Sequence, residues 1–116
     1  MSEPNPLPPQ PALAAAFLLE QALELHQRGE LEKAQALYHQ VLTLTSEDFT
    51  AVHQLGVIRN QVGDFSAALG FLEKALGLHP RSALAHFNMG LALWNLGRGE
   101  EALAHYQYSL VLKPNH

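Results

Sequence analysis

Apolar residues in the middle of the chain recur with the spacing of α-helices. Leu55 and Ile58 lie on one predicted helix that runs up to Gly63, and residues 65–78 again place apolar side chains along one helical face. Pro80 then ends this second helix, because proline is poorly accommodated in a continuing helix and pushes the residue before it out of the helical region. The pattern predicts helix, tight turn, helix, tight turn.

The same pattern recurs with a shift of 34 residues. When the chain is aligned with itself at this shift, residues at the same place in each repeat fall in one column. Glycines occupy one such column, alanines a second and leucines a third, and prolines occupy a fourth in the last two repeats. The matched sets are Gly29, Gly63 and Gly97; Ala34, Ala68 and Ala102; Leu42, Leu76 and Leu110; and Pro80 and Pro114. So many matches at one shift indicate an internal repeat.

Two long motifs resemble the tetratricopeptide repeat family: LGVIRNQVGDFSAALGFLEKALGLHP and MGLALWNLGRGEEALAHYQYSLVLKP. The resemblance implies an all-α superhelix, or solenoid, of three helix-turn-helix repeats. These are residues 15–48, 49–82 and 83–116 within a domain spanning 12–116. The first repeat departs from the pattern, with Gln21-Ala22 in place of the Leu-Gly and Met-Gly pairs of the other two.

Residues 1–11 contain five of the seven prolines, so this leader is predicted to be disordered. Asp64, directly after Gly63, is expected to cap the helix that follows. The pairs Gly56 with Ala68 and Gly90 with Ala102 are expected to let the paired helices approach closely.

The resemblance also implies a concave groove, lined by the first helix of each repeat, that binds an extended peptide or a partner's helix. The residues at the matched positions are Leu19, Glu20, Leu23, His26, His53, Gln54, Val57, Asn60, Gln61, Leu84, Phe87, Asn88, Leu91, Trp94 and Asn95. We therefore expect a protein-binding scaffold.

Co-chaperones of this family clamp an acidic peptide tail with cationic side chains. The matching positions here are Leu19, Leu84 and Asn88, which carry no positive charge. A dicarboxylate needs cations to offset its lost hydration. The sequence therefore excludes a carboxylate clamp of that kind.

Amide side chains at the groove positions suggest another mode, because each can both donate to and accept from a peptide backbone. The runs FNMG at 87–90 and LKPNH at 112–116 resemble the repeats of O-GlcNAc-transferase-like proteins. This resemblance implies an alternative: the substrate-recruiting N-terminal region of a larger, bacterial glycosyltransferase. Exposed amides that are merely solvated remain the simpler interpretation.

No catalytic motif is present, so no enzymatic activity and no cofactor are predicted. No two of the seven histidines are spaced i, i+4, so no metal site is predicted either. His53 and His86 are expected to approach each other on adjacent first helices. Trp94 fits either an anchor for a partner or a residue packed on a neighbouring helix.

The net charge of −4 and the absence of a basic cluster argue against a nucleic-acid partner. The apolar run 12–19 is too short to span a membrane and has no positive residues before it, so a cytoplasmic protein without a membrane partner is expected. Leu96, Leu103, Tyr106 and Leu110 are expected to face a missing neighbour after the third repeat. The chain is then either a piece of a longer protein or a homo-oligomer through this end.

Overall fold

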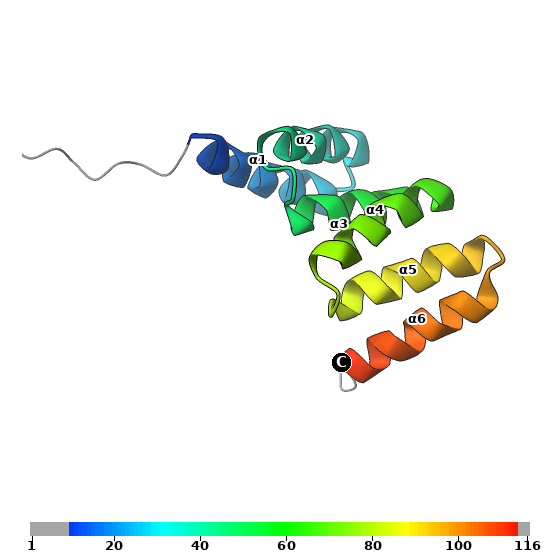
Figure 1. Cartoon of the computed structure of the whole chain (residues 1–116). Coiled ribbons are helices and arrows are strands. Elements are labelled where there is room, and N and C mark those ends of the chain that lie inside the picture. The colour runs from blue at the N-terminus through cyan, green and yellow to red at the C-terminus, as the bar shows by residue number, and fades with distance from the viewer. Residues whose placement is uncertain (1–9, 114–116) are drawn as a thin grey trace, which may run out of the picture. The chain divides into compact units, whose positions relative to one another are not determined.

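The computed structural model describes residues 10–113, and within that range every regular element is an α-helix. The helices are α1 (Gln10–Gln27), α2 (Leu31–Leu44), α3 (Phe49–Gln61), α4 (Phe65–Leu78), α5 (Ala83–Asn95) and α6 (Gly99–Leu112) (Figure 1). They form three successive pairs, α1 with α2, α3 with α4 and α5 with α6. The predicted all-α class and the order of the elements are confirmed.

Helix α1 begins at Gln10, so the last two residues of the expected leader belong to the helix. Pro11 fits there because the first-turn amides of a helix have no intrahelical partner, and a proline loses nothing by lacking one. The other nine residues of that leader lie outside the described residues, as does the end of the LKPNH run.

Each helix pair turns at a glycine in the left-handed region. The φ angles of Gly29, Gly63 and Gly97 are 78°, 82° and 79°. The amide after each glycine reaches back over the helix end, as in Asp64 N–H to the Arg59 carbonyl at 2.8 Å and Arg98 N–H to the Leu93 carbonyl at 2.9 Å. Glycine is the residue that adopts this turn without a Cβ penalty. The column of glycines is therefore set by the turns between helices.

The predicted cap on α4 is confirmed: Asp64 Oδ1 accepts a hydrogen bond from the Ala67 amide at 3.3 Å. Ser82 caps α5 in the same way, accepting from the Ala85 amide at 3.1 Å. Arg98 occupies the matching position before α6 and makes no side-chain cap hydrogen bond.

The chain divides into two compact units, one ending at Asp48 and the other beginning at Phe49. This division coincides with the expected boundary between the first and second repeats. In the first unit, Tyr38 of α2 is fully buried. Burial raises the pKa of Tyr38 to about 12, and its hydroxyl lies 3.2 Å from His26 Nδ1.

In the second unit, the core between α4, α5 and α6 consists of alanine and leucine side chains together with one methionine. Its fully packed members are Ala68, Leu72, Met89, Ala92, Leu93 and Ala102. Phe65, Leu69 and Leu76 close its edge. This core holds α5 in place, and α5 carries most of the exposed candidate groove residues.

The glycines inside the helices approach larger neighbours than expected. A Cβ placed on Gly56 would lie 2.8 Å from Leu72 Cγ, and one on Gly90 would lie 2.8 Å from the Tyr106 ring. The side chains nearest to these glycines are thus Leu72 and Tyr106, each four residues after the expected Ala68 and Ala102. These glycines leave space on the first helix of each pair for a large side chain of the second helix.

Candidate functional site

The candidate site of the second unit is built on α3 and α5, whose polar and apolar residues have different roles. Among the polar residues, His53 and Asn60 of α3 are 3% and 9% exposed. Asn88 Nδ2 lies 3.1 Å from His53 Nε2, and Asn60 Nδ2 donates to the Asn88 carbonyl at 3.0 Å. We call these three residues the polar seam.

The polar seam ties α3 to α5, which differs from the expectation of an accessible amide ladder. His53 and Asn60 are buried because α5 packs against α3. The His53 ring also stacks on Phe49, with ring centroids 5.4 Å apart. Burial lowers the pKa of His53, which suits a ring nitrogen that accepts a hydrogen bond from an amide.

The expected approach of His53 to His86 was wrong. His53 lies against Asn88, whereas His86 turns to the other helix of its own repeat and meets His105. The sequence positions of the two first-helix histidines differ within the repeat, so they face different neighbours.

The accessible apolar residues lie on α5. Leu84 is 56% exposed, Phe87 46% and Trp94 64%, and Leu91 is half-buried between them. These four residues form what we call the α5 strip. Large apolar side chains exposed together at helical spacing are typical of a surface that a partner covers.

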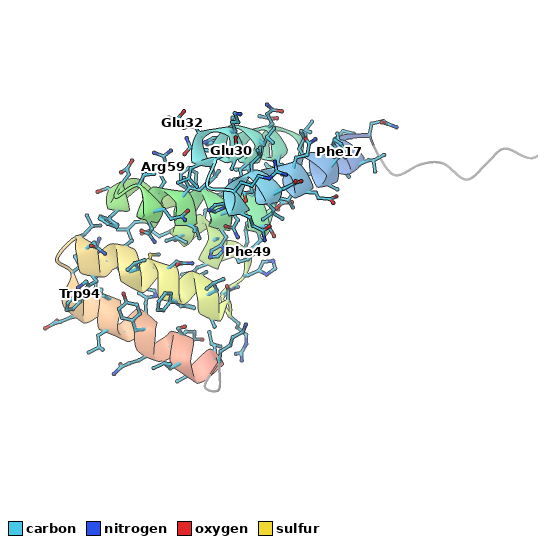
Figure 2. The ribbon with its side chains drawn as sticks, turned by 180° about the vertical axis from the view of Figure 1, so that it is seen from behind. Phe17, Glu30, Glu32, Phe49, Arg59 and Trp94 are labelled. Atoms are coloured by element: carbon cyan, nitrogen blue, oxygen red, sulfur yellow. The ribbon has the colours of Figure 1, made fainter. Side chains whose placement is uncertain are left out.

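Trp94 lies at the end of α5, next to the turn into α6 (Figure 2). A Cβ placed on Gly99 would lie 3.4 Å from Trp94 Cζ3, so the indole ring leans over the start of α6. The ring is nevertheless largely exposed. Trp94 therefore touches the neighbouring helix and still presents most of its ring to solvent.

The other expected groove residues are mixed in exposure. Gln54 and Val57 are half-buried on α3, whereas Gln61 and Asn95 are exposed. Asn95 donates to the Leu91 carbonyl of its own helix at 2.8 Å. In the first unit, Leu19, Leu23 and His26 are half-buried and Glu20 is exposed.

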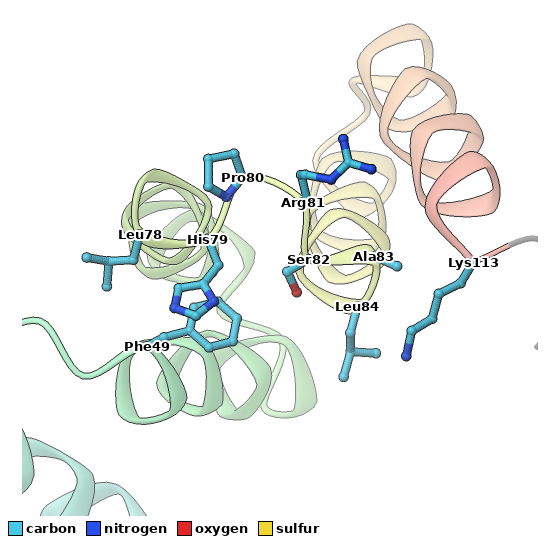
Figure 3. A pocket seen from close by; sticks show the side chains of 9 residues that line it. All are labelled: Phe49, Leu78, His79, Pro80, Arg81, Ser82, Ala83, Leu84 and Lys113. Atoms are coloured by element: carbon cyan, nitrogen blue, oxygen red, sulfur yellow. The ribbon is translucent and has the colours of Figure 1, made fainter.

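A pocket of about 540 Å³ opens at the start of α5. Its wall combines apolar groups with two cations, and the lining residues are Phe49, Leu78, His79, Pro80, Arg81, Ser82, Ala83, Leu84 and Lys113 (Figure 3). The His79 ring stacks on Phe49 with centroids 4.3 Å apart and forms one side. A second pocket of about 260 Å³ joins Leu84 and Lys113 to Phe87 and Ser109.

Lys113 borders both pockets, and Figure 3 shows its side chain beside that of Leu84. The Arg81 side chain points away from Leu84, on the other side of the turn that precedes α5 (Figure 3). Sequence reasoning missed both cations because they lie in the turn before α5 and at the end of α6, outside the first-helix columns. The signal available was that both residues flank the repeated Pro80 and Pro114 positions.

The residues expected to face a missing neighbour differ in their exposure, and the neighbour itself stays a prediction. Leu103 and Leu110 are each 56% exposed and Leu96 is 37% exposed. Tyr106 is half-buried, because its ring packs over Gly90 and against Phe87, with the Phe87 and Tyr106 ring centroids 5.5 Å apart.

Two further properties bear on the kind of site. None of the described helices is long and apolar enough to cross a bilayer. Among residues 10–113, no three His, Asp or Glu side chains gather where a metal ion could be held.

Comparison with known proteins identifies the repeat. A family model described as tetratricopeptide repeat matches residues 53–116. Mouse tetratricopeptide repeat protein 28 is 28% identical over 110 residues, which is 92% of this chain and 4% of that protein. The chain thus spans a small part of this curated relative.

Solved structures agree on the fold. An O-GlcNAc transferase mutant from Thermobaculum terrenum superposes with a TM-score of 0.89 at 25% identity, over 95% of this chain and 21% of that one. The first TPR of Spaghetti, solved with an HSP90 peptide, gives 0.83 at 22% identity over 88% and 81% of the two chains. The Arabidopsis OM64 TPR domain gives 0.87 at 22% identity over 91% and 88%. These matches confirm an all-α repeat solenoid.

Proposed function

Because this chain belongs to the tetratricopeptide repeat family, a non-catalytic repeat module, we propose that it is a scaffold that binds a peptide or a partner's helix and has no activity of its own. The observation that carries the proposal is the α5 strip. Its side chains are large, apolar and accessible, and the packed core beneath them fixes their positions. Preorganised aromatic anchors of this kind supply much of the binding energy at protein interfaces.

The chemistry of the neighbouring pockets narrows the class of partner. Leu84 and Phe87 offer contact area, and Lys113 places an ammonium group at the edge of the same surface. We therefore expect an extended peptide with an apolar side chain followed by a carboxylate. This arrangement differs from the carboxylate clamp, whose cations would stand at Leu19, Leu84 and Asn88.

A library of random peptides displayed on phage tests the proposal. Peptides selected on the whole chain should bind Phe87→Ala and Trp94→Ala variants at least about tenfold more weakly, the size of effect expected for a hot-spot truncation. Lys113→Gln should weaken only those peptides that carry the carboxylate.

The matched control is Val111→Ser, since Val111 is 74% exposed on α6 and lies outside the strip. Equal binding by the wild type and by this control supports the assignment. Selected peptides that bind the Phe87 and Trp94 variants as tightly as the wild type would refute it.

A recruiting arm of a glycosyltransferase remains a second candidate. It is favoured by the superposition with the Thermobaculum terrenum enzyme, of which this chain matches 21%. Western blotting of the source cells with an antibody raised against this chain tests the idea. A single endogenous band near 12.8 kDa would exclude it.

Self-association is a third candidate, favoured by the exposed Leu103, Leu110 and Val111 on α6. The proposal predicts a mass that rises with concentration in light scattering. Leu103→Glu should abolish the rise by placing a charge in the contact, whereas Val62→Glu, at an exposed site in the turn between α3 and α4, should not. A monomeric mass at all concentrations would exclude it.

A further inference from the structure

Two histidine rings from different helices meet on α5 and α6. His86 Nδ1 and His105 Nδ1 lie 3.0 Å apart, and the two ring planes differ by 27°. Both side chains are half-buried. Their ring nitrogens are therefore held toward each other by the packing of one helix pair.

The hydrogen-bond partner of His86 Nε2 determines which ring nitrogen of His86 carries the hydrogen. His86 Nε2 lies 2.8 Å from the Pro80 carbonyl, which can only accept, so Nε2–H is the donor. In the neutral ring, His86 Nδ1 then accepts the hydrogen bond from His105 Nδ1–H, and both Nδ1 lone pairs become available to a metal ion when His105 carries its hydrogen on Nε2 instead. A histidine whose far N–H is held by a backbone carbonyl is the usual arrangement behind a metal-binding ring nitrogen.

The distance between the two Nδ1 atoms suits one class of coordination geometry. With bonds of about 2.0–2.1 Å from each nitrogen, a separation of 3.0 Å corresponds to an angle of about 94° at the metal. That value is close to the right angle between adjacent ligands of a square-planar ion and narrower than a tetrahedral angle. Square-planar sites with nitrogen and oxygen donors are typical of Cu²⁺ and Ni²⁺.

The surroundings leave room for such an ion and its remaining ligands. A pocket of about 310 Å³ is lined by both rings together with Pro80, Ala104 and Tyr108.

We propose that His86 and His105 form a binding site for a divalent square-planar ion, Cu²⁺ or Ni²⁺. The two Nδ1 atoms occupy adjacent positions, and water completes the coordination. The site is independent of the α5 strip and goes beyond the peptide-binding function.

Titration of the metal-free whole chain with Cu²⁺ and then Ni²⁺, followed by calorimetry, tests the site. The wild type should take up one ion most tightly, with the electron paramagnetic resonance spectrum of Cu²⁺ showing two coupled nitrogens. His86→Gln and His105→Gln should each weaken that site by at least about tenfold, the range seen even for supporting residues around metals.

The matched control is His39→Gln, which removes an exposed histidine from α2. It should leave the tight site unchanged. Circular dichroism establishes that each variant is folded. Binding that survives in the folded double variant His86→Gln, His105→Gln, or that falls equally in the control, would overturn the proposal.

Discussion

Within the second unit, α3 and α5 have the same place in the repeat, yet matched positions behave in opposite ways. His53 and Asn60 of α3 are buried, although both are polar. Phe87 and Trp94, which occupy the same two columns one repeat later, are 46% and 64% exposed although both are aromatic. The usual relation between polarity and burial is inverted.

The difference follows from which neighbour each helix has. Helix α5 packs against α3, so the polar side chains of that column are enclosed and bond to Asn88. Burial of polar groups is tolerated when they are hydrogen-bonded, although Asn60 Oδ1 is the one buried side-chain oxygen without a partner among the described residues. The same two columns thus hold buried polar residues in α3 and accessible aromatic residues in α5.

The largest effect on stability is expected when residues are exchanged between the matched positions 60 and 94. Asn60→Trp should lower the free energy of unfolding by about 1–3 kcal/mol or more, because an indole does not fit the enclosed site. The reciprocal Trp94→Asn should change it by less than about 0.5 kcal/mol, as for other exposed positions. Chemical denaturation measures both, and equal losses would contradict the comparison.

The helix glycines give a second, smaller contrast. Gly56→Ala pushes a methyl group against Leu72, which is fully buried and cannot move aside. Gly90→Ala meets Tyr106, which is partly exposed and can shift. We expect a loss of about 1–3 kcal/mol for Gly56→Ala and a smaller one for Gly90→Ala, partly offset in both by the better helix propensity of alanine. Thermal unfolding of the two variants side by side would reveal a reversed order.

The helix starts provide a third contrast. Asp64→Ala should cost about 1 kcal/mol, because it removes the cap on α4. At the matching position before α6, Arg98→Ala removes no side-chain cap and should leave stability nearly unchanged. Urea denaturation of both variants checks the pair, and a larger loss for Arg98→Ala would show that its ion pair with Glu101 matters more than the cap.

The last prediction concerns pH. The pKa of His53 is lower in the folded protein than its ordinary value of 6.5, so the unfolded chain binds the proton more readily. The contribution of His53 to the free energy of unfolding should therefore be fully present above pH 6.5. It should decrease as the pH falls through and below that value. His105, whose pKa is lowered as well, contributes in the same direction.

Replacing His53 by Phe, the residue found one repeat later, should flatten the acid side of this profile. Measuring unfolding free energy between pH 5 and pH 8 for both proteins tests this, with His39→Gln as the control. An unchanged slope in His53→Phe would show that another group is responsible.

Much of this fold followed from local pattern. The 34-residue period, the three turn glycines and the Asp64 cap predicted the helix pairs, since left-handed turns and free helix amides favour particular residues wherever they occur. Phe87 and Trp94 are exposed, and their place in a binding groove stays a prediction. The start of α1 at Gln10 was missed because proline is unfavourable inside a helix but well suited to its first turn.

What the sequence alone determined is therefore the repeating unit: helix pairs that turn at Gly29, Gly63 and Gly97, with a capped helix start at Asp64. What only the tertiary structure decided is how identical columns are used. Burial of His53 and Asn60, the contact of Gly90 with Tyr106, and the meeting of His86 with His105 each depend on a second helix. Turn and cap preferences act between residues close in the chain, whereas burial and ring contacts depend on which helix packs alongside.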